Sequence, residues 1–185
     1  MEFTMFSYLP SLQNFIRPKL EVCYLPDYPE SLSDVIAWSK TSSPGFIAGD
    51  EKDEHFIRTH QDKFYLLMYG EGPLRQVIGM FALLDVKLDE QIQSAFTEHK
   101  IPNVKELNYV YLAKNVRGLG MGSALVKHAK QVARNLHADV IVLDTLTPAL
   151  NQFYIKNGAT VICENRYPHH EENAIRTSVL RINLS

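Results

Sequence analysis

The chain has 185 residues, a formal net charge of −2 at pH 7 and 45% hydrophobic residues, a size and composition that predict one globular domain. The charge is close to neutral and no basic run occurs, so nucleic acid is not expected as a partner. No apolar run approaches the roughly twenty residues that span a bilayer.

The two cysteines, Cys23 and Cys163, are too few for a disulfide framework, and their spacing is unlike that of a zinc site. This cysteine usage favours a reducing compartment, so we expect a cytoplasmic protein. A membrane partner is not expected, because the apolar runs are too short to span a bilayer. Residues 1–19 are moderately apolar but carry Glu2 and Pro10 and have no basic leader, which indicates an N-terminal arm and not a signal peptide.

The first half of the chain alternates strand-like and helix-like patterns. Predicted in order are a strand over Leu20–Leu25, a helix over Pro29–Lys40, a charged segment of undecided type over Asp50–His60, an antiparallel strand pair over Phe64–Tyr69 and Gln76–Leu84, and a helical insertion over Leu88–His99. Within the first helix, Leu32, Val35, Ile36 and Ser39 share one face. Trp38 is expected in the core.

The second half continues in the same way. Predicted here are a strand over Leu107–Leu112, a helix after the glycine-rich segment Val116–Ser123, a buried strand over Asp139–Leu146, a short helix over Ala149–Lys156 and a closing strand over Thr177–Leu184. Together these elements predict an α/β fold with a mixed sheet and helices on both faces.

The glycine-rich segment joins a strand to a helix. The first amides of a helix lack internal partners and carry partial positive charge, so a turn without bulky side chains lets anionic oxygens approach them. Arg117 adds a cation there. A P-loop is excluded because Ala124 and Leu125 follow Gly122-Ser123, and a dinucleotide fingerprint lacks its third glycine. A simple tight turn remains the alternative.

Arg117, Gly120 and Gly122 fit the pattern Arg/Gln-x-x-Gly-x-Gly/Ala, which resembles the acyl-CoA loop of the GNAT superfamily of N-acetyltransferases. Downstream, TPALNQFYIKNGA is similar to that family's second cofactor motif, with Phe153, Tyr154, Lys156 and Gly158 at the matching places. Thr147 and Ala159 depart from it, where Asn and an aromatic residue are usual.

This resemblance covers about residues 20–184 and implies a GNAT acyltransferase domain over 20–185. The implied fold is a mixed, largely antiparallel sheet flanked by helices and splayed between two central parallel strands. The implied ligand is acetyl-CoA as co-substrate. The implied contacts to it are Leu112, Ala113, Arg117, Gly118, Leu119, Gly120, Met121, Gly122, Ser123, Asn151, Phe153 and Lys156.

Amine acetylation also needs proton transfer, because about one lysine-like amine in a few thousand is neutral at pH 7. Glu106 is the predicted base, since a Glu early on this strand often has that role in the family, and Asp85 is a weaker competitor. Tyr154 is the predicted acid that protonates the leaving thiolate, and packing under the cofactor helix is its alternative role. Tyr109 and Tyr111 share one strand face, either in an acceptor channel or in the core.

No metal site is expected, because His169-His170-Glu171-Glu172 is read as a surface loop.

The resemblance implies transfer of an acetyl group from acetyl-CoA to a primary amine by direct attack in a ternary complex. The alternatives are a non-catalytic acyl-CoA-binding sensor and a dinucleotide-binding oxidoreductase. The amine is open between small molecules and peptide or protein amines, and the assembly between monomer and homodimer.

Overall fold

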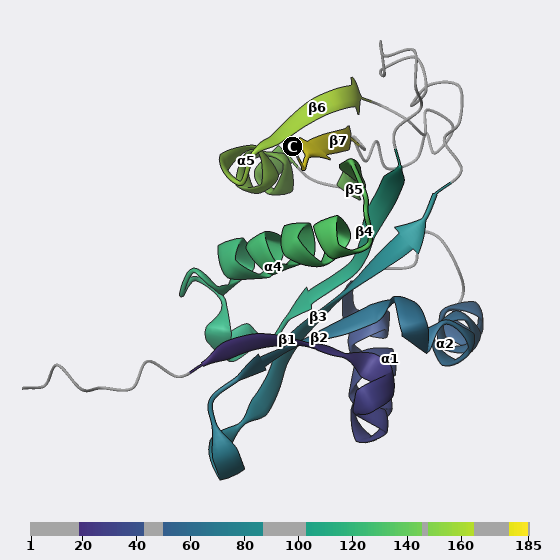
Figure 1. Cartoon of the computed structure of the whole chain (residues 1–185), viewed down its shortest axis with the longest axis vertical. Helices are drawn as coiled ribbons and strands as arrows, with labels where there is room; N and C mark the ends of the chain where they lie inside the picture. The colour runs from purple at the N-terminus through teal and green to yellow at the C-terminus, as the bar shows by residue number, and fades with distance from the viewer. Residues whose placement is uncertain (1–18, 43–49, 87–102, 146–147, 165–177, 185) are drawn as a thin grey trace, which may run out of the picture.

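The computed structural model describes residues 19–42, 50–86, 103–145, 148–164 and 178–184, which form one seven-stranded sheet with the strand order β1-β2-β3-β4-β5-β7-β6 (Figure 1). The strands are β1 (Leu20–Tyr24), β2 (Phe64–Tyr69), β3 (Gln76–Asp85), β4 (Val104–Leu112), β5 (Val140–Thr145), β6 (Ala159–Glu164) and β7 (Ser178–Asn183). The α-helices are α1 (Leu32–Ser42), α2 (Asp50–Thr59), α4 (Met121–Asn135) and α5 (Pro148–Lys156).

Every strand pair is antiparallel except β4 with β5. The first four strands form an antiparallel meander, and α4 is the crossover that the parallel pair requires. This arrangement confirms the predicted mixed, largely antiparallel sheet.

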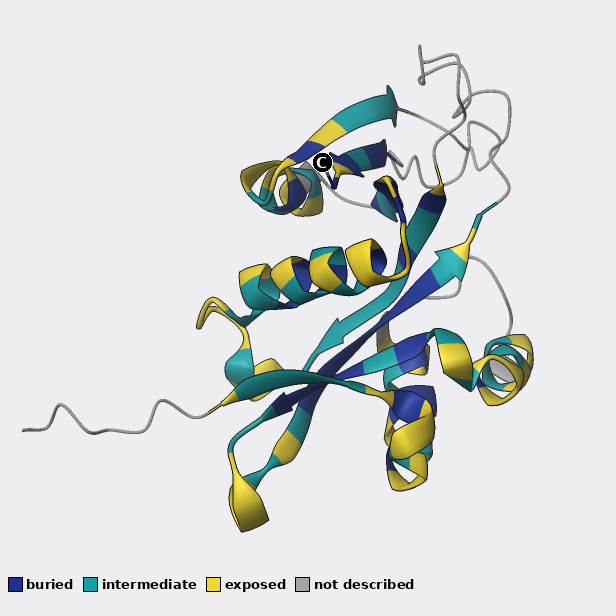
Figure 2. Cartoon of the chain, in the orientation of Figure 1, coloured by how far each residue is buried: buried dark blue, intermediate teal, exposed yellow. Residues whose placement is uncertain are grey.

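The helices cover both faces of the sheet, with α4 on one side and α1 and α2 on the other (Figure 1). The α4 core includes Leu125, Ala129 and Ala133, and the α1–α2 core includes Val35 and Ile57. Between the two cores lies β3, which is buried from Ile78 to Leu83 (Figure 2). The two apolar helix faces therefore pack against opposite sides of one buried strand.

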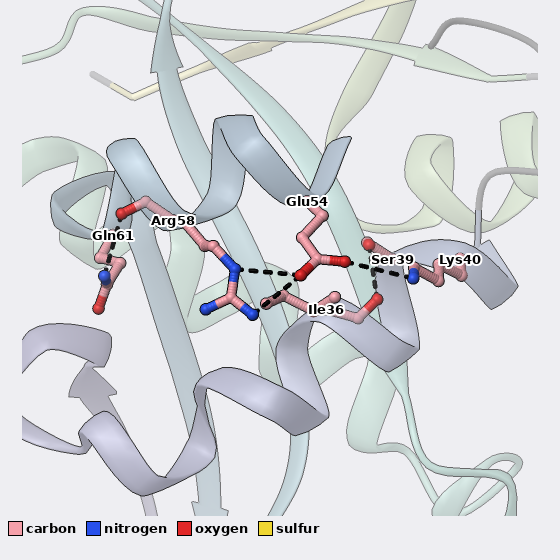
Figure 3. A network of polar contacts seen from close by, with 6 residues as sticks. All are labelled: Ile36, Ser39, Lys40, Glu54, Arg58 and Gln61. Atoms are coloured by element: carbon pink, nitrogen blue, oxygen red, sulfur yellow. Dashed lines mark hydrogen bonds and ion pairs between the residues drawn. The ribbon is translucent and has the colours of Figure 1, made fainter. Parts of the chain in front are cut away.

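A polar network joins α1 to α2 (Figure 3). Glu54 of α2 pairs with Lys40 of α1 at 3.4 Å and with Arg58 at 2.9 Å, and hydrogen bonds from Arg58 and Lys40 lower the pKa of Glu54. Ser39 is fully buried and donates to the Ile36 carbonyl at 2.8 Å, which satisfies its hydroxyl within the predicted apolar face.

The structure decides the type of one segment and adds one strand. The charged segment is a helix, α2, because Phe56 and Ile57 give it an apolar side that packs on the sheet. The run Ala159–Glu164 forms β6, a strand that was not predicted although Val161 and Ile162 are β-branched. Several other predictions lie outside the described residues: the N-terminal arm, the insertion at 88–99, Thr147 and the His169–Glu172 loop.

Candidate active site

The two parallel strands separate soon after they pair. Only Val104–Glu106 of β4 pairs with β5, opposite Val140–Val142, while β4 continues to Leu112. The separation opens a cavity of about 730 Å³. It is lined by Thr41, Glu106, Leu107, Asn108, Tyr109, Val110, Tyr111, Leu112, Arg117, Gly118, Gly120, Gly122, Ser123, Leu125, Val126, Asp144, Thr145, Leu150, Phe153 and Tyr154.

The glycine-rich segment forms one wall of this cavity. Gly120 precedes α4 with φ 81°, a left-handed conformation that favours glycine, and no side chain caps the helix. The bond from the Ala124 amide to the Gly120 carbonyl, at 3.2 Å, is the first of the helical series. The amides of Met121, Gly122 and Ser123 therefore precede the helical ladder, and such amides are suited to bind an anion.

Gly122 lets α4 and α5 approach each other. A Cβ added at Gly122 would lie 3.1 Å from Cζ and 3.2 Å from Cε2 of Phe153. Phe153 also contacts Tyr154 edge-on, with ring centroids 5.0 Å apart. The absence of a side chain at Gly122 thus lets the Phe153 ring of the second motif lie against the first turn of α4.

Arg117 is exposed at the edge of the cavity and contacts the end of β4. Its Nε donates to the Leu112 carbonyl at 2.9 Å, and its guanidinium lies 5.5 Å from the ring centroid of Tyr111. The Ala113 amide donates to Ile78 of β3 at 2.8 Å. Backbone groups alternate along a strand, so those of Leu112 project toward the open side. Of the two predicted strand-end contacts, Leu112 lines the cavity and Ala113 does not.

Glu106 lies on β4 where the strands begin to separate, and it lines the cavity. Its Oε1 accepts a hydrogen bond from Nδ2 of Asn108 at 2.9 Å.

Asp85 lies elsewhere. It is paired with Lys105 and, at 3.4 Å, with Lys63, and it does not line the cavity. The hydrogen bond from Lys105, helped by Lys63, lowers the pKa of Asp85. A carboxylate held in its charged form by two lysines is a poor proton acceptor, so the structure disfavours Asp85 as the competing base.

Tyr154 faces the cavity from α5 and is 6% exposed. Burial raises the pKa of Tyr154 to about 12, because a phenolate is poorly solvated there. The phenol is therefore protonated across the physiological pH range. A phenol that stays protonated can act as a proton donor, as the predicted role of Tyr154 requires.

Two predicted cofactor contacts on α5 lie differently. Asn151 accepts a hydrogen bond from the Thr145 hydroxyl and donates to the Ser178 hydroxyl at 2.8 Å. These bonds tie α5 to the ends of β5 and β7, and they account for Asn151 without a ligand. Lys156 is exposed at the last turn of α5 and does not line the cavity.

In the glycine-rich segment, the side chains of Leu119 and Met121 also lie away from the cavity. Leu119 is 68% exposed, and Met121 packs against the α4 core. A contact from these two residues would therefore come from the main chain.

The cavity also contains residues that the sequence analysis did not assign to it. Asn108, Asp144, Thr145 and Thr41 contribute polar groups. Asp144 is the next-to-last residue of β5, which ends at the cavity. A polar residue at the end of a buried strand is the sequence signal that could have identified it. Thr41 comes from α1, which no local pattern connects with β4.

Tyr109 and Tyr111 lie on the α1–α2 side and also line the cavity. Tyr111 stacks on Trp38 with centroids 4.9 Å apart, and Tyr109 stacks on Phe56 at 5.9 Å. Each tyrosine therefore packs in the core and also borders the cavity, and a contact with the acceptor stays a prediction.

Within the described ranges, no three His, Cys, Asp or Glu side chains gather as a metal site would require. None of the helices described there has the length and apolar character to cross a membrane.

Residues 16–158 match the profile of the acetyltransferase (GNAT) family. Among curated proteins, none matches the sequence. Solved structures share the fold at low identity. A chain of the NatC complex bound to a Gag peptide and CoA is 15% identical, with a TM-score of 0.65 over 90% of this chain and 99% of that chain.

Two further structures are similar. A mutant spermidine N-acetyltransferase from Vibrio cholerae is 12% identical, with a TM-score of 0.61 over 90% of this chain and 95% of that one. The N-acetylglutamate synthase of Neisseria gonorrhoeae, in complex with coenzyme A and N-acetyl-glutamate, is 13% identical, with a TM-score of 0.58. The match covers 90% of this chain and 35% of that chain.

Proposed function

Because this chain belongs to the acetyltransferase (GNAT) family, we propose that it transfers an acetyl group from acetyl-CoA to a primary amine by direct attack in a ternary complex. The observation that carries the proposal is the shared cavity: the amides at the start of α4, the Glu106 carboxylate and the Tyr154 phenol all border the opening between β4 and β5. The groups that we propose for anion binding, for the base and for the acid therefore belong to residues around one cavity.

The diphosphate of acetyl-CoA is proposed to bind at the amides of Met121, Gly122 and Ser123, where the charge of the helix terminus favours it. Arg117 then leaves the Leu112 carbonyl, which it holds at 2.9 Å, and pairs with the diphosphate. The released carbonyl is free to accept a hydrogen bond from an amide of the pantetheine arm, as an added strand would provide. Phosphate and pantetheine binding are coupled through this one side chain.

The acceptor amine is proposed to lose its proton to Glu106, directly or through a water molecule. Attack of the neutral amine on the thioester carbonyl forms the new C–N bond, and the C–S bond breaks as the tetrahedral intermediate collapses. The nitrogen releases its second proton to solvent, and Glu106 passes on the first one in the same way. Tyr154 donates its proton to the departing sulfur and regains one from solvent, so the products are the N-acetylated amine and CoA with a free thiol.

A panel of ligands and amines tests the proposal. Calorimetry with acetyl-CoA, free CoA and NAD identifies the ligand, and release of the CoA thiol is then measured with a peptide N-terminus, spermidine and glutamate. We expect acetyl-CoA to bind and at least one amine to release thiol. Binding without release would indicate an acyl-CoA sensor, and NAD binding instead of CoA binding would indicate an oxidoreductase.

A matched pair of variants tests the binding mode. Arg117→Ala should weaken CoA binding about tenfold, the loss of one charge-assisted contact. Lys114→Ala removes an exposed cation from the preceding turn, outside the cavity, and should leave CoA affinity unchanged. Equal losses in both variants would indicate general electrostatic attraction and not a specific diphosphate contact.

A further inference from the structure

Asn108 lies in the middle of β4, where the strand pairing is irregular. Met80 of β3 faces Tyr111 and Ala82 faces Asn108, so β4 carries one extra residue between these pairs. Tyr109, in this bulge, has φ 51°, a conformation that costs a bulky residue about 1–3 kcal/mol and persists only where the surroundings enforce it. Backbone strain of this kind requires nearby contacts that hold it.

The bulge changes which residues face which helices. Leu107 packs in the α4 core, and strict alternation would place Tyr109 and Tyr111 on that same side. Both instead pack in the α1–α2 core, whereas Val110 packs on the α4 side. The extra residue therefore turns both tyrosines toward α1 and α2.

The Asn108 side chain joins this bulge to Glu106. Its Oδ1 accepts a hydrogen bond from the Tyr109 amide at 2.7 Å, and its Nδ2 donates to Oε1 of Glu106 at 2.9 Å. A backbone N–H can only donate, so the oxygen of the carboxamide must face Tyr109 and the NH₂ group must face the carboxylate. The backbone thus determines the orientation of the side chain that contacts Glu106.

The far side of the bulge is held by α2. The Tyr109 hydroxyl donates to Oδ1 of Asp53 at 3.0 Å, and the Tyr109 ring stacks on Phe56. Burial, together with the hydrogen bond to Asp53, raises the pKa of Tyr109 well above its ordinary value, so this hydroxyl stays a donor. A continuous set of contacts therefore runs from α2 through the bulge to Glu106.

We propose that Asn108 is a positioning residue for the acetyl transfer: its carboxamide holds the Glu106 carboxylate in place for the acceptor amine, using the Tyr109 bulge as a rigid support. This inference rests on the proposed role of Glu106 as base. A glutamate has three rotatable bonds, and a donated hydrogen bond to its charged form selects one orientation at little further cost.

The substitution N108D isolates the contact with Glu106. It keeps an oxygen for the Tyr109 amide and replaces the NH₂ donor with a second acceptor, so the bulge stays satisfied while the contact to Glu106 becomes repulsive. Thiol release from acetyl-CoA, with whichever of the peptide, spermidine or glutamate reacts fastest, gives kcat for wild type, N108D, E106Q and the double variant. Calorimetry gives acetyl-CoA affinity, and far-ultraviolet circular dichroism monitors the fold.

We expect N108D to lower kcat about tenfold or more with acetyl-CoA affinity unchanged, since a general base contributes about 10²–10⁴-fold. In the E106Q background the same change should cause no further loss, because the carboxylate that Asn108 positions is gone. Equal losses in both backgrounds would overturn the proposal in favour of a purely structural role, as would unchanged kcat in N108D.

The two proposals fail in different ways. Absence of thiol release with every amine in the wild-type protein would contradict the proposed function and remove the basis of this inference. An active wild-type protein with a strongly impaired E106Q variant and an unimpaired N108D variant would overturn the role of Asn108 alone.

Discussion

The indole of Trp38 stacks on the ring of Tyr111, with centroids 4.9 Å apart and an interplanar angle of 16°. The Arg117 guanidinium lies over the same tyrosine ring. Tyr111 therefore contacts both Trp38 of α1 and Arg117, the residue proposed to bind the diphosphate. Helix α1 also borders the cavity, through Thr41. The proposed movement of Arg117 would therefore change the electrostatic environment of this aromatic pair, which packs on the α1–α2 side of the sheet.

Trp38 is the only tryptophan in the chain, so its emission reports on this pair. We expect CoA to change the Trp38 fluorescence as Arg117 leaves the Tyr111 ring, with a midpoint equal to the calorimetric Kd. In Arg117→Ala the change at saturating CoA should be largely lost. An unaltered emission during calorimetrically proven binding would show that Arg117 keeps its contact with Tyr111.

Gly122 and Phe153 are predicted to be coupled in stability. Alanine in a helix is favoured over glycine by about 1 kcal/mol, but the added methyl would lie 3.1 Å from the Phe153 ring. Urea unfolding should therefore show no gain from Gly122→Ala in the wild-type protein and a gain of about 1 kcal/mol in a Phe153→Ala background. The same effect in both backgrounds would mean that the two residues do not restrict each other.

Much of the fold could be predicted from local patterns, because helical spacing and β-branched runs identify elements such as α4 and β5 directly. The site depends on tertiary relationships that no local pattern contains. The bulge at Tyr109 has no glycine to indicate it, and it reverses the faces of the residues that follow Asn108. Asp85 is a poor base because the register of β3 and β4 sets it opposite Lys105, and this register cannot be read from the sequence around Asp85.

Asn151 is predicted to stabilise the fold and not the cofactor complex. Replacing it with alanine removes its hydrogen bonds to the hydroxyls of Thr145 and Ser178 and leaves Thr145 only the longer bond to the Ser178 carbonyl at 3.4 Å, which should lower the free energy of unfolding by about 1–3 kcal/mol. Acetyl-CoA affinity should stay within about twofold. Gln152→Ala, at an exposed position of the same helix, is the control and should change neither quantity. A selective loss of affinity in Asn151→Ala would restore the cofactor role.

Asp85 gives a pH-dependent contribution to stability. Its pKa is lowered in the folded protein, so the stabilisation is present above the ordinary value of 3.8 and is lost as the pH falls through the folded value. Asp85→Asn should cost about 0.2–1 kcal/mol at neutral pH, since the carboxylate is largely exposed, with no cost in strong acid. Urea unfolding of both proteins, from neutral pH to strong acid, measures this difference in the free energy of unfolding. The kcat of Asp85→Asn should be unchanged. A large loss of kcat would return Asp85 to the catalytic site.

Tyr154→Phe separates proton donation from packing. The ring is retained, so acetyl-CoA affinity and stability should change little, whereas kcat should fall about 10²-fold or more if the phenol protonates the leaving sulfur. Because burial raises the pKa of Tyr154 to about 12, ionisation of this phenol should not lower the wild-type rate as the pH rises from neutral to moderately alkaline values. Thiol release followed over that range, in parallel with the phenylalanine variant, tests both points. An unchanged kcat in the variant would restrict Tyr154 to packing against Phe153. A wild-type decline near neutral pH that disappears in the variant would contradict the raised pKa.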